Sequence, residues 1–358
     1  MSTVVTGMNV TMEAVRSPVK ATRPAPEAPK AQDGLPLAWR SSYSGAVELK
    51  DIEDARARIA GRVRRTPMLQ VGPVREPGRL PHHLFCKLEL LQVTGSFKAR
   101  GAMNKLLTLP AEKVSRGLGT ASGGNHGLGV AYAGWTAHVP ATIYLPHSTP
   151  RAKAEKLAVW GAEVRWAGSV WDEANAAALD AAEREGWTYV HPFADPAVIA
   201  GQGTLGLEIL EDLPDVDTVV VAIGGGGLIA GVATALKTLR PSIRVIGVEP
   251  TGAPTLQASV RAGQLVELEH IATAAGTLAP RRSAEINLAI VRRLVDEIVL
   301  VDDDDMREAA RWLWHEFGVG VELSGAAALA ALLSGRLPGE RDRRICALLC
   351  GAGSDGIG

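Results

Sequence analysis

From Val47 onward, the chain alternates between short apolar runs and longer segments in which apolar residues recur with helical period. The short runs are rich in Val and Ile, which is typical of strands buried on both faces of a sheet. Short strands that alternate with longer helices predict an α/β fold with mainly parallel sheets covered on both faces. The predicted strands span 84–88, 142–145, 218–223, 244–248, 298–301 and 345–349, and the predicted helices span 51–61, 127–138, 151–160, 172–186, 228–239, 303–317 and 324–334.

Residues 1–45 lack this pattern. Their first 40 positions hold five prolines and scattered basic residues without a sustained period. Segments of this kind bury too little apolar surface to offset the entropy lost on ordering. We therefore expect residues 1–45 to form a disordered N-terminal extension.

Charge and composition exclude several classes of protein. The 358 residues include 38 Lys and Arg and 39 Asp and Glu, so the chain lacks the cationic surplus of a nucleic-acid binder. It also lacks the run of about 18 apolar residues that a membrane-spanning helix needs. The three cysteines (Cys86, Cys346 and Cys350) are too few for a disulfide framework and favour a reducing, cytoplasmic location.

The strongest candidate site is the run Gly224-Gly225-Gly226-Gly227, which lies between a predicted strand and the helix that begins near Leu228. Successive glycines leave backbone N–H groups uncovered at a helix N-terminus, where the helix dipole also favours an anion. No Lys-Ser or Lys-Thr pair follows, which excludes a nucleoside-triphosphate loop, and the spacing differs from the dinucleotide pattern. The run therefore predicts a site for a phosphate group.

Lys98 follows Gly95, Ser96 and Phe97 and precedes apolar residues with helical spacing. The spacing places Lys98 in the first turn of a helix, where the positive end of the helix dipole helps to lower the pKa of an amine. Schiff-base chemistry requires the neutral amine, so a lysine in this place is suited to it.

The loop at residues 122–127, Ser-Gly-Gly-Asn-His-Gly, also precedes a predicted helix. Its consecutive N–H groups and the Ser122 hydroxyl predict a nest for a carboxylate. The side chain of Asn125 is suited to form a hydrogen bond with a phenolic oxygen or with the substrate. His126 has two equally good interpretations, as an ordinary residue at a helix start and as a functional residue. A phosphate loop, a primed lysine and a carboxylate nest in one chain together indicate pyridoxal 5′-phosphate and an amino-acid substrate.

These motifs belong to a longer pattern that resembles the fold-type II pyridoxal-phosphate enzymes of the threonine and serine dehydratase group. The resemblance extends from about Ile52 to Asp355. It implies a fold like that of the tryptophan synthase β subunit, with two three-layer domains. The large domain would comprise residues 46–113 and 190–358, and the small domain residues 114–189. The segments that carry the resemblance are 87–89, 95–102, 122–127, 191–193, 199–204, 224–228, 247–250 and 349–351.

The resemblance also implies a role for each site residue. Lys98 would form the Schiff base with the cofactor, Phe97 would pack on the cofactor ring, and Asn125 would contact the ring oxygen. The implied reaction is the α,β-elimination of a 3-hydroxy amino acid, such as L-threonine or L-serine, to a 2-oxo acid and ammonia. The phosphate would be held by Gly224, Gly225, Gly226, Gly227 and the N–H of Leu228, and the substrate by Ser122, Gly123, Gly124, Asn125 and His126.

Two residues depart from the pattern of the group. Cys350 stands where a Ser or Thr usually faces the pyridine nitrogen, and a thiol is a weaker hydrogen-bond partner. A thiol does not protonate the ring as a carboxylate would, which favours prompt expulsion of a β-leaving group over a long-lived carbanion. Gly123 stands where serine racemases of the group carry a second Ser that acts on the opposite ring face. Glycine has no proton to give, so we expect elimination over racemisation.

A divalent-cation site is implied with an incomplete ligand set. It would comprise Glu249, the Ala253 carbonyl and an acidic residue two positions later, where this chain has Thr255. The resemblance further implies a homodimer or homotetramer. The C-terminal regulatory domain of the biosynthetic threonine dehydratases has no counterpart, so we expect no feedback control of that kind.

Three other functions stay open. The first is β-replacement, as in relatives similar to cysteine synthase, although these usually carry Thr where His126 stands. The second is dehydration of a larger 3-hydroxy amino acid, for which Arg281 and Arg282 would favour an acidic substrate. The third is a cofactor carrier or inactive subunit, against which Lys98 and the complete glycine run argue.

Overall fold

The computed structural model describes Met1 and residues 47–357. Apart from Met1, the predicted N-terminal extension lies outside these residues. The strands are β1 (Met68–Gln70), β2 (His83–Lys87), β3 (Leu118–Ala121), β4 (Ala141–Leu145), β5 (Glu163–Trp166), β6 (Thr188–Tyr189), β7 (Thr218–Ala222), β8 (Arg244–Pro250), β9 (Glu297–Val301) and β10 (Arg344–Leu348).

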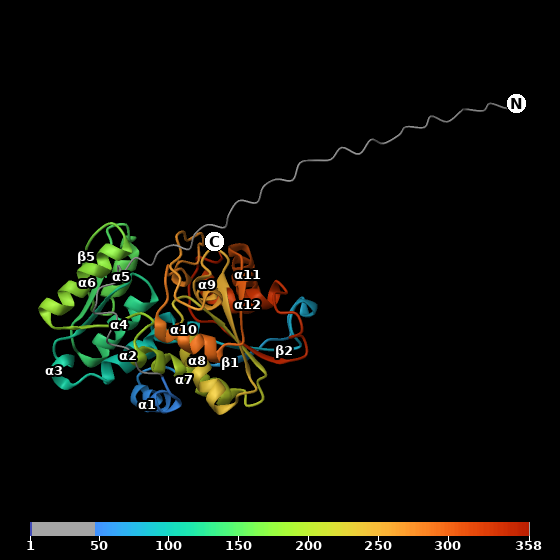
Figure 1. The fold of residues 1–358 in the computed structure, drawn as a ribbon, viewed down its shortest axis with the longest axis horizontal. Coiled ribbons are helices and arrows are strands. Elements are labelled where there is room, and N and C mark those ends of the chain that lie inside the picture. The colour runs from blue at the N-terminus through green and yellow to red at the C-terminus, as the bar shows by residue number, and fades with distance from the viewer. Residues whose placement is uncertain (2–46, 358) are drawn as a thin grey trace. The chain divides into compact units, whose positions relative to one another are not determined.

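The strands form two sheets (Figure 1). One is six-stranded with the order β1-β2-β10-β7-β8-β9, and the other is four-stranded with the order β5-β4-β3-β6. All neighbouring pairs are parallel except β1 and β2. The helices are α1 (Leu49–Ile59), α2 (Lys98–Leu107), α3 (Ala111–Val114), α4 (Asn125–Ala137), α5 (Arg151–Ala158), α6 (Trp171–Glu185), α7 (Pro196–Asp212), α8 (Gly227–Leu239), α9 (Thr255–Ala262), α10 (Glu285–Leu294), α11 (Asp303–Phe317) and α12 (Leu323–Leu333).

The predicted α/β fold with mainly parallel sheets is confirmed. Every predicted strand and helix is present, with ends displaced by no more than two residues. The central strand β7 is buried at all positions, as its unbroken apolar run indicates. The pattern missed β1, β3, β5 and β6, which are short, and the helices α3, α7, α9 and α10.

Helices cover both faces of the four-stranded sheet. Ile143 and Leu145 of β4 pack in one apolar cluster with Leu128 of α4. Tyr144, between them, packs in another cluster with Ala178 of α6. Because successive side chains of a strand point to opposite faces, α4 and α6 lie on opposite sides of this sheet.

Helix α7 was not predicted because it contains several glycines, and these glycines allow close packing against neighbouring helices. Gly201, Gly203 and Gly206 weaken a helix prediction because glycine costs a helix about 1 kcal/mol relative to alanine. In the structure, a Cβ at Gly201 would lie 2.7 Å from the Gly101 Cα of α2, and one at Gly203 would lie 2.9 Å from the Gly231 carbonyl of α8. The glycines thus let α7 lie directly against α2 and α8, and Figure 1 shows α7 beside α8.

The two sheets draw on different parts of the chain. The strands of the four-stranded sheet come from residues 118–189, and those of the six-stranded sheet come from segments before and after this range. The domain boundaries given above stay a prediction. Among the helices of residues 47–357, none is both long enough and apolar enough to cross a membrane.

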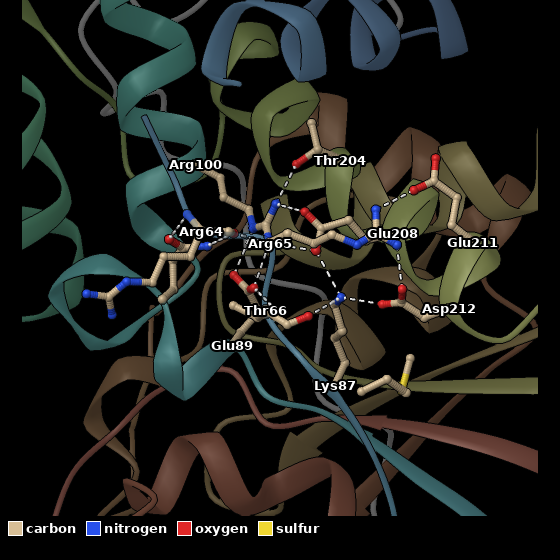
Figure 2. A network of polar contacts seen from close by, with 12 residues as sticks. Arg64, Arg65, Thr66, Lys87, Glu89, Arg100, Thr204, Glu208, Glu211 and Asp212 are labelled. Atoms are coloured by element: carbon tan, nitrogen blue, oxygen red, sulfur yellow. Dashed lines mark hydrogen bonds and ion pairs between the residues drawn. The ribbon is translucent and has the colours of Figure 1, made fainter. Parts of the chain in front are cut away.

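Buried charged side chains link α2 to β2 and α7 (Figure 2). Arg100 of α2 donates to Glu89 at 2.7 and 2.9 Å and to Glu208 of α7 at 2.6 Å. Lys87 of β2 lies 2.9 Å from Glu208 and 2.8 Å from Asp212. The side chains of Lys87 and Arg100 are 0% and 1% exposed, so each needs these carboxylates to offset its loss of hydration.

Thr66 completes the network. Its hydroxyl donates to Glu89 at 2.6 Å, and its carbonyl accepts from Lys87 at 2.7 Å. Arg100 lies two residues after Lys98 in the same helix. The network therefore holds the first turn of α2, from which Lys98 projects, against the end of β2.

We predict that Arg100→Met lowers the free energy of unfolding by about 3–5 kcal/mol, because it leaves the buried Glu89 carboxylate without a cation and Glu208 with Lys87 alone. Urea denaturation of the purified protein measures this change. Arg184→Met, which removes an exposed ion pair with Asp180 in α6, is the matched control and should change stability little. Equal losses in the two variants would contradict the role of the network.

Candidate active site

Lys98 is the first residue of α2, as predicted. The residues before it are tied to the end of β10, because Ser96 forms a bridge with Gly351 and the Phe97 N–H donates to the Cys350 carbonyl at 3.3 Å. The Lys98 Nζ donates to the Pro192 carbonyl at 2.7 Å and lies 5.1 Å from the centre of the Phe97 ring.

The environment of Lys98 favours a neutral amine. Burial lowers its pKa to about 8, while the nearby Cys350 and Glu322 act in the opposite direction. The sequence predicted this direction from the helix dipole, whereas the largest cause in the structure is removal from water. Among residues 47–357, no carboxylate lies within ion-pair distance of the Lys98 amine. A carbonyl partner bonds the amine without stabilising its charge as strongly as a carboxylate would.

The glycine run follows β7 and ends at the start of α8. Within the described part of the chain, the N–H groups from Gly224 to Leu228 donate no hydrogen bond. Gly226, Gly227 and Leu228 are buried, where an unbonded N–H is costly. Several free donors at the positive end of a helix suit an anionic group such as a phosphate.

Neighbouring side chains give this run its shape. The Gly225 carbonyl accepts from the Ser283 hydroxyl at 2.9 Å and from the Asn287 amide at 2.7 Å. A Cβ at Gly225 would lie 2.2 Å from the Phe193 ring, and Gly226 has a φ of +94°. Both positions therefore need glycine. The sequence pattern missed Ser283 and Asn287, because neither adjoins a recognisable motif.

The loop at residues 122–127 lies beside both other motifs. A Cβ at Gly124 would meet Thr277 at 3.8 Å, and one at Gly224 would meet the Thr277 carbonyl at 2.8 Å. Helix α4, which this loop opens, comes so near α2 that a Cβ at Gly129 would lie 2.9 Å from the Lys98 carbonyl. The structure thus brings the three predicted motifs together, and the Gly124 N–H donates to the Ser122 hydroxyl at 3.3 Å.

His126 lies in the wall of this region as a neutral side chain. Its Nε2 is 2.9 Å from the Val190 carbonyl, so Nε2 carries the ring proton. Burial, with a further contribution from Lys98, lowers its pKa to about 3. His126 is therefore no cationic partner at neutral pH, and the predicted contact with substrate stays a prediction.

Cys350 lies at the carboxyl end of β10 with a protonated thiol. Burial raises the pKa of this thiol well above its usual range. Its Sγ lies 3.8 Å from the Ser324 carbonyl, to which it donates. A neutral thiol is the weak hydrogen-bond partner that was expected at this position. That Cys350 faces the pyridine nitrogen of the cofactor stays a prediction.

Glu322 is the acidic residue at this site that the sequence analysis missed. It occupies the N-cap position of α12 without a capping bond from its side chain, and its Oε1 accepts from the Asn125 Nδ2 at 2.8 Å. Burial raises its pKa to about 7, and repulsion from Asp355 adds to the effect. In the sequence, Glu322 precedes a predicted helix and reads as an ordinary cap. Only the fold brings it to Asn125.

The residues of the predicted cation site are engaged in another way. Both carboxylate oxygens of Glu249 accept backbone N–H groups at the start of α9, from Leu256 at 2.7 Å and Gln257 at 2.8 Å. The Ala253 carbonyl accepts from the Thr255 N–H at 2.9 Å. Within the described residues, no group of three or more His, Cys, Asp and Glu side chains is placed to hold a metal ion. A cation held by Glu249 and Ala253 stays a prediction.

Comparison with known proteins identifies the family. Residues 59–351 match the profile of the family described as pyridoxal-phosphate dependent enzymes. The chain belongs to this family. The L-threonine ammonia-lyase of Geobacter sulfurreducens is 42% identical over 297 residues, which are 83% of this chain and 73% of that one. The catabolic L-threonine dehydratase of Escherichia coli is 39% identical over 315 residues, 88% of this chain and 95% of that one.

Solved structures of similar proteins agree with this assignment. The processed form of threonine deaminase isoform 2 from Solanum lycopersicum superposes with a TM-score of 0.82 at 34% identity, over 91% of this chain and 96% of that chain. Maize serine racemase gives the same TM-score, 0.82, at 35% identity, over 86% and 94% of the two chains. The predicted fold type and the predicted cofactor, pyridoxal phosphate, are thereby confirmed.

The residues present fit this cofactor. The unbonded N–H groups from Gly224 to Leu228 suit its phosphate, and the desolvated Lys98 amine suits its aldehyde. Glycine is required at Gly225 and Gly226, so the chain keeps its backbone open at the place where a phosphate would approach.

We predict that the Lys98 amine of the cofactor-free protein titrates with a midpoint near pH 8. Because burial lowers this pKa, roughly one tenth of the amine is neutral at pH 7, and its reactivity should rise through pH 8 and then level off. Labelling with an amine-reactive anhydride at a series of pH values, read by mass spectrometry of the Lys98 peptide, measures the midpoint. Lys98→Arg removes the labelled position and serves as the control. A midpoint near 10.5 would show that the amine is hydrated.

Proposed function

We propose that this protein catalyses the α,β-elimination of a 3-hydroxy amino acid, L-threonine or L-serine, to a 2-oxo acid and ammonia. The observation that carries the proposal is the Lys98 amine, which donates to the Pro192 carbonyl and whose pKa burial lowers to about 8. Relatives at 39–42% identity that are named threonine ammonia-lyase or dehydratase support the substrate class.

Each group of the chain has a defined task in this proposal. Pyridoxal phosphate, when bound, supplies an electron-withdrawing system that acidifies the α-proton of an attached amino acid. The Lys98 Nζ, in its neutral form, accepts the α-proton as a general base and returns a proton to the β-hydroxyl, which leaves as water. The released 2-amino enoic acid takes up water and gives the 2-oxo acid and ammonia. The N–H groups of residues 122–127 hold the substrate carboxylate, which fixes the α-carbon beside Lys98. The surrounding protein shields the protonated Lys98 amine from water, so that the proton is not exchanged with solvent.

Lys98→Ala should lower the rate of 2-oxo acid formation from L-threonine by ~10³-fold or more, because it removes the base and the amine that anchors the cofactor. Detection of the 2-oxo acid as its hydrazone measures the rate. The exposed Lys113→Ala is the matched control and should retain activity. Adding a sulfide donor tests β-replacement in the same assay, and adding 3-hydroxyaspartate tests a larger, acidic substrate. Activity of Lys98→Ala equal to that of the unchanged protein would refute the proposal.

Racemisation is the second candidate, because maize serine racemase is among the similar structures. The space at Gly123 argues against it. A Cβ there would lie 3.1 Å from the Thr149 methyl group and 3.2 Å from Leu145, so even a small side chain requires these neighbours to yield. Without a side chain, Gly123 offers no acid for the second ring face.

Arg281, which the sequence suggested for an acidic substrate, is exposed and donates to the Leu268 carbonyl at 3.0 Å.

We therefore predict that L-serine yields far more 2-oxo acid than D-serine. Gly123→Ser should raise the ratio of D-serine to 2-oxo acid, because the hydroxyl supplies a proton donor. Gly123→Ala, which introduces the same Cβ without the hydroxyl, is the control for crowding against Thr149 and Leu145. Chiral chromatography of the products measures the ratio. Abundant D-serine from the unchanged protein would overturn this assignment.

We also propose that the protein works as a homodimer or homotetramer in the cytoplasm. Several large apolar side chains are exposed on the described residues, among them Trp135, Val159 and Trp171. Exposed apolar residues of this size are common at interfaces between subunits. The three cysteines are free and buried, as is usual in a reducing compartment.

A further inference from the structure

Glu322 is held in a fixed place by its backbone. Its N–H donates to the Gly351 carbonyl at 3.1 Å, and its own carbonyl accepts from Gly325 at 2.8 Å and from Ala326 at 3.1 Å. The next N–H, that of Leu323, donates to Asp355 at 3.1 Å. The position of the Glu322 side chain is therefore set by the end of β10 and the start of α12, which belong to the six-stranded half of the fold.

The carboxylate of Glu322 reaches the other half of the fold. Its Oε1 accepts from the Nδ2 of Asn125, the first residue of α4, at 2.8 Å across a separation of 197 residues in the chain. Gly351 leaves the room for this bond. A Cβ at Gly351 would lie 2.2 Å from the Glu322 Oε1 and 3.2 Å from the Asn125 Nδ2.

Among the described residues, no cation neutralises Glu322 directly. Within residues 47–357 it forms no ion pair, although Lys98 and Lys156 act on it from a distance and Asp355 repels it. The thiol of Cys350 is the other titratable group that faces it. Glu322 is half-buried, and a carboxylate that loses part of its hydration without gaining an ion pair needs a polar partner to compensate the loss. That partner is the Asn125 amide.

The chemistry of an amide explains what this bond does. An amide presents an oxygen on one side and an NH₂ group on the other, and a carboxylate accepts only from the NH₂ group. The bond therefore determines which way the Asn125 amide faces. One N–H of Nδ2 is bonded to Glu322, and the second N–H is left to donate to another acceptor.

We propose that Glu322 is the positioning residue that fixes the Asn125 amide with its NH₂ group available to the cofactor. The proposal rests on the proposed function and on the contact between Asn125 and the cofactor ring that the family resemblance implies. Glu322 then acts through Asn125 and needs no contact with the cofactor or the substrate. Loss of Glu322 frees the amide to turn, so the protein binds the cofactor more weakly.

A double-mutant cycle on cofactor binding tests this proposal. The dissociation constant of pyridoxal phosphate is measured by equilibrium dialysis for the cofactor-free full-length protein and for Glu322→Ala, Asn125→Ala and the double variant. Each single variant should bind about 10-fold more weakly, because a hydrogen bond to a charged group is lost. The double variant should bind no more weakly than Asn125→Ala alone, since Glu322 acts only through Asn125.

Glu322→Gln separates positioning from general loss of structure. Its amide oxygen accepts from Asn125 as the carboxylate does, so this variant should keep affinity within about 2-fold of the unchanged protein at pH 7. Glu308→Gln, an exposed carboxylate of α11 paired with Arg79, is the matched control. Thermal unfolding of each variant verifies that it is folded.

The outcomes separate this proposal from the proposed function. If Asn125→Ala leaves cofactor affinity unchanged, the contact of Asn125 with the cofactor and the positioning role of Glu322 both fail, whereas the proposed elimination is tested separately by Lys98→Ala. If Asn125→Ala weakens binding and the two substitutions are additive, or if Glu322→Gln binds as weakly as Glu322→Ala, the positioning role alone is overturned.

Discussion

In the part of the chain that the structure describes, the Lys98 amine is removed from water with no carboxylate at ion-pair distance, and the rest of the structure depends on this constraint. Lys98 bonds a backbone carbonyl, and its pKa falls to about 8. Lys87 and Arg100, which are fully buried, are each matched by two carboxylates. Two buried cations and the half-buried Lys98 thus lie within one short stretch of chain. A cation that is paired with carboxylates, such as Lys87 or Arg100, stabilises the fold. The Lys98 amine, which is not paired in this way, is available for chemistry.

Close packing of helices creates the place in which this amine is desolvated. Glycines in α2, α7 and α8 let these helices approach until their backbones nearly touch, and Gly129 does the same for α4 against Lys98. Interiors packed this tightly leave little room for water, so a polar group there depends on the partners that the fold provides. The ion network of Arg100 then keeps α2 from moving within the packing, which fixes where the amine points.

The sequence predicts those parts of the site in which local pattern and function coincide. The glycine run after β7 and the lysine at the start of α2 follow from strand and helix signals alone, and both lie where they were expected. Helix α7 escaped prediction because its glycines serve contacts with helices that are distant in the chain. Glu322 escaped it for a related reason, since its partner Asn125 is 197 residues away. No window along the chain contains information of that kind.

The pKa values of Lys98 and Glu322 are shifted by the same cause, and the charge of each group also acts on the other. The same loss of water lowers the pKa of the amine to about 8 and raises the pKa of the carboxyl to about 7, so burial favours the neutral form of both. Each charge still favours the other from a distance, which limits both shifts. The unbonded N–H groups of residues 224–228 are a separate attraction for an anion, which does not depend on the protonation of either side chain. A phosphate held there by dipoles leaves the lysine free to exchange its proton with the substrate rather than to neutralise a ligand.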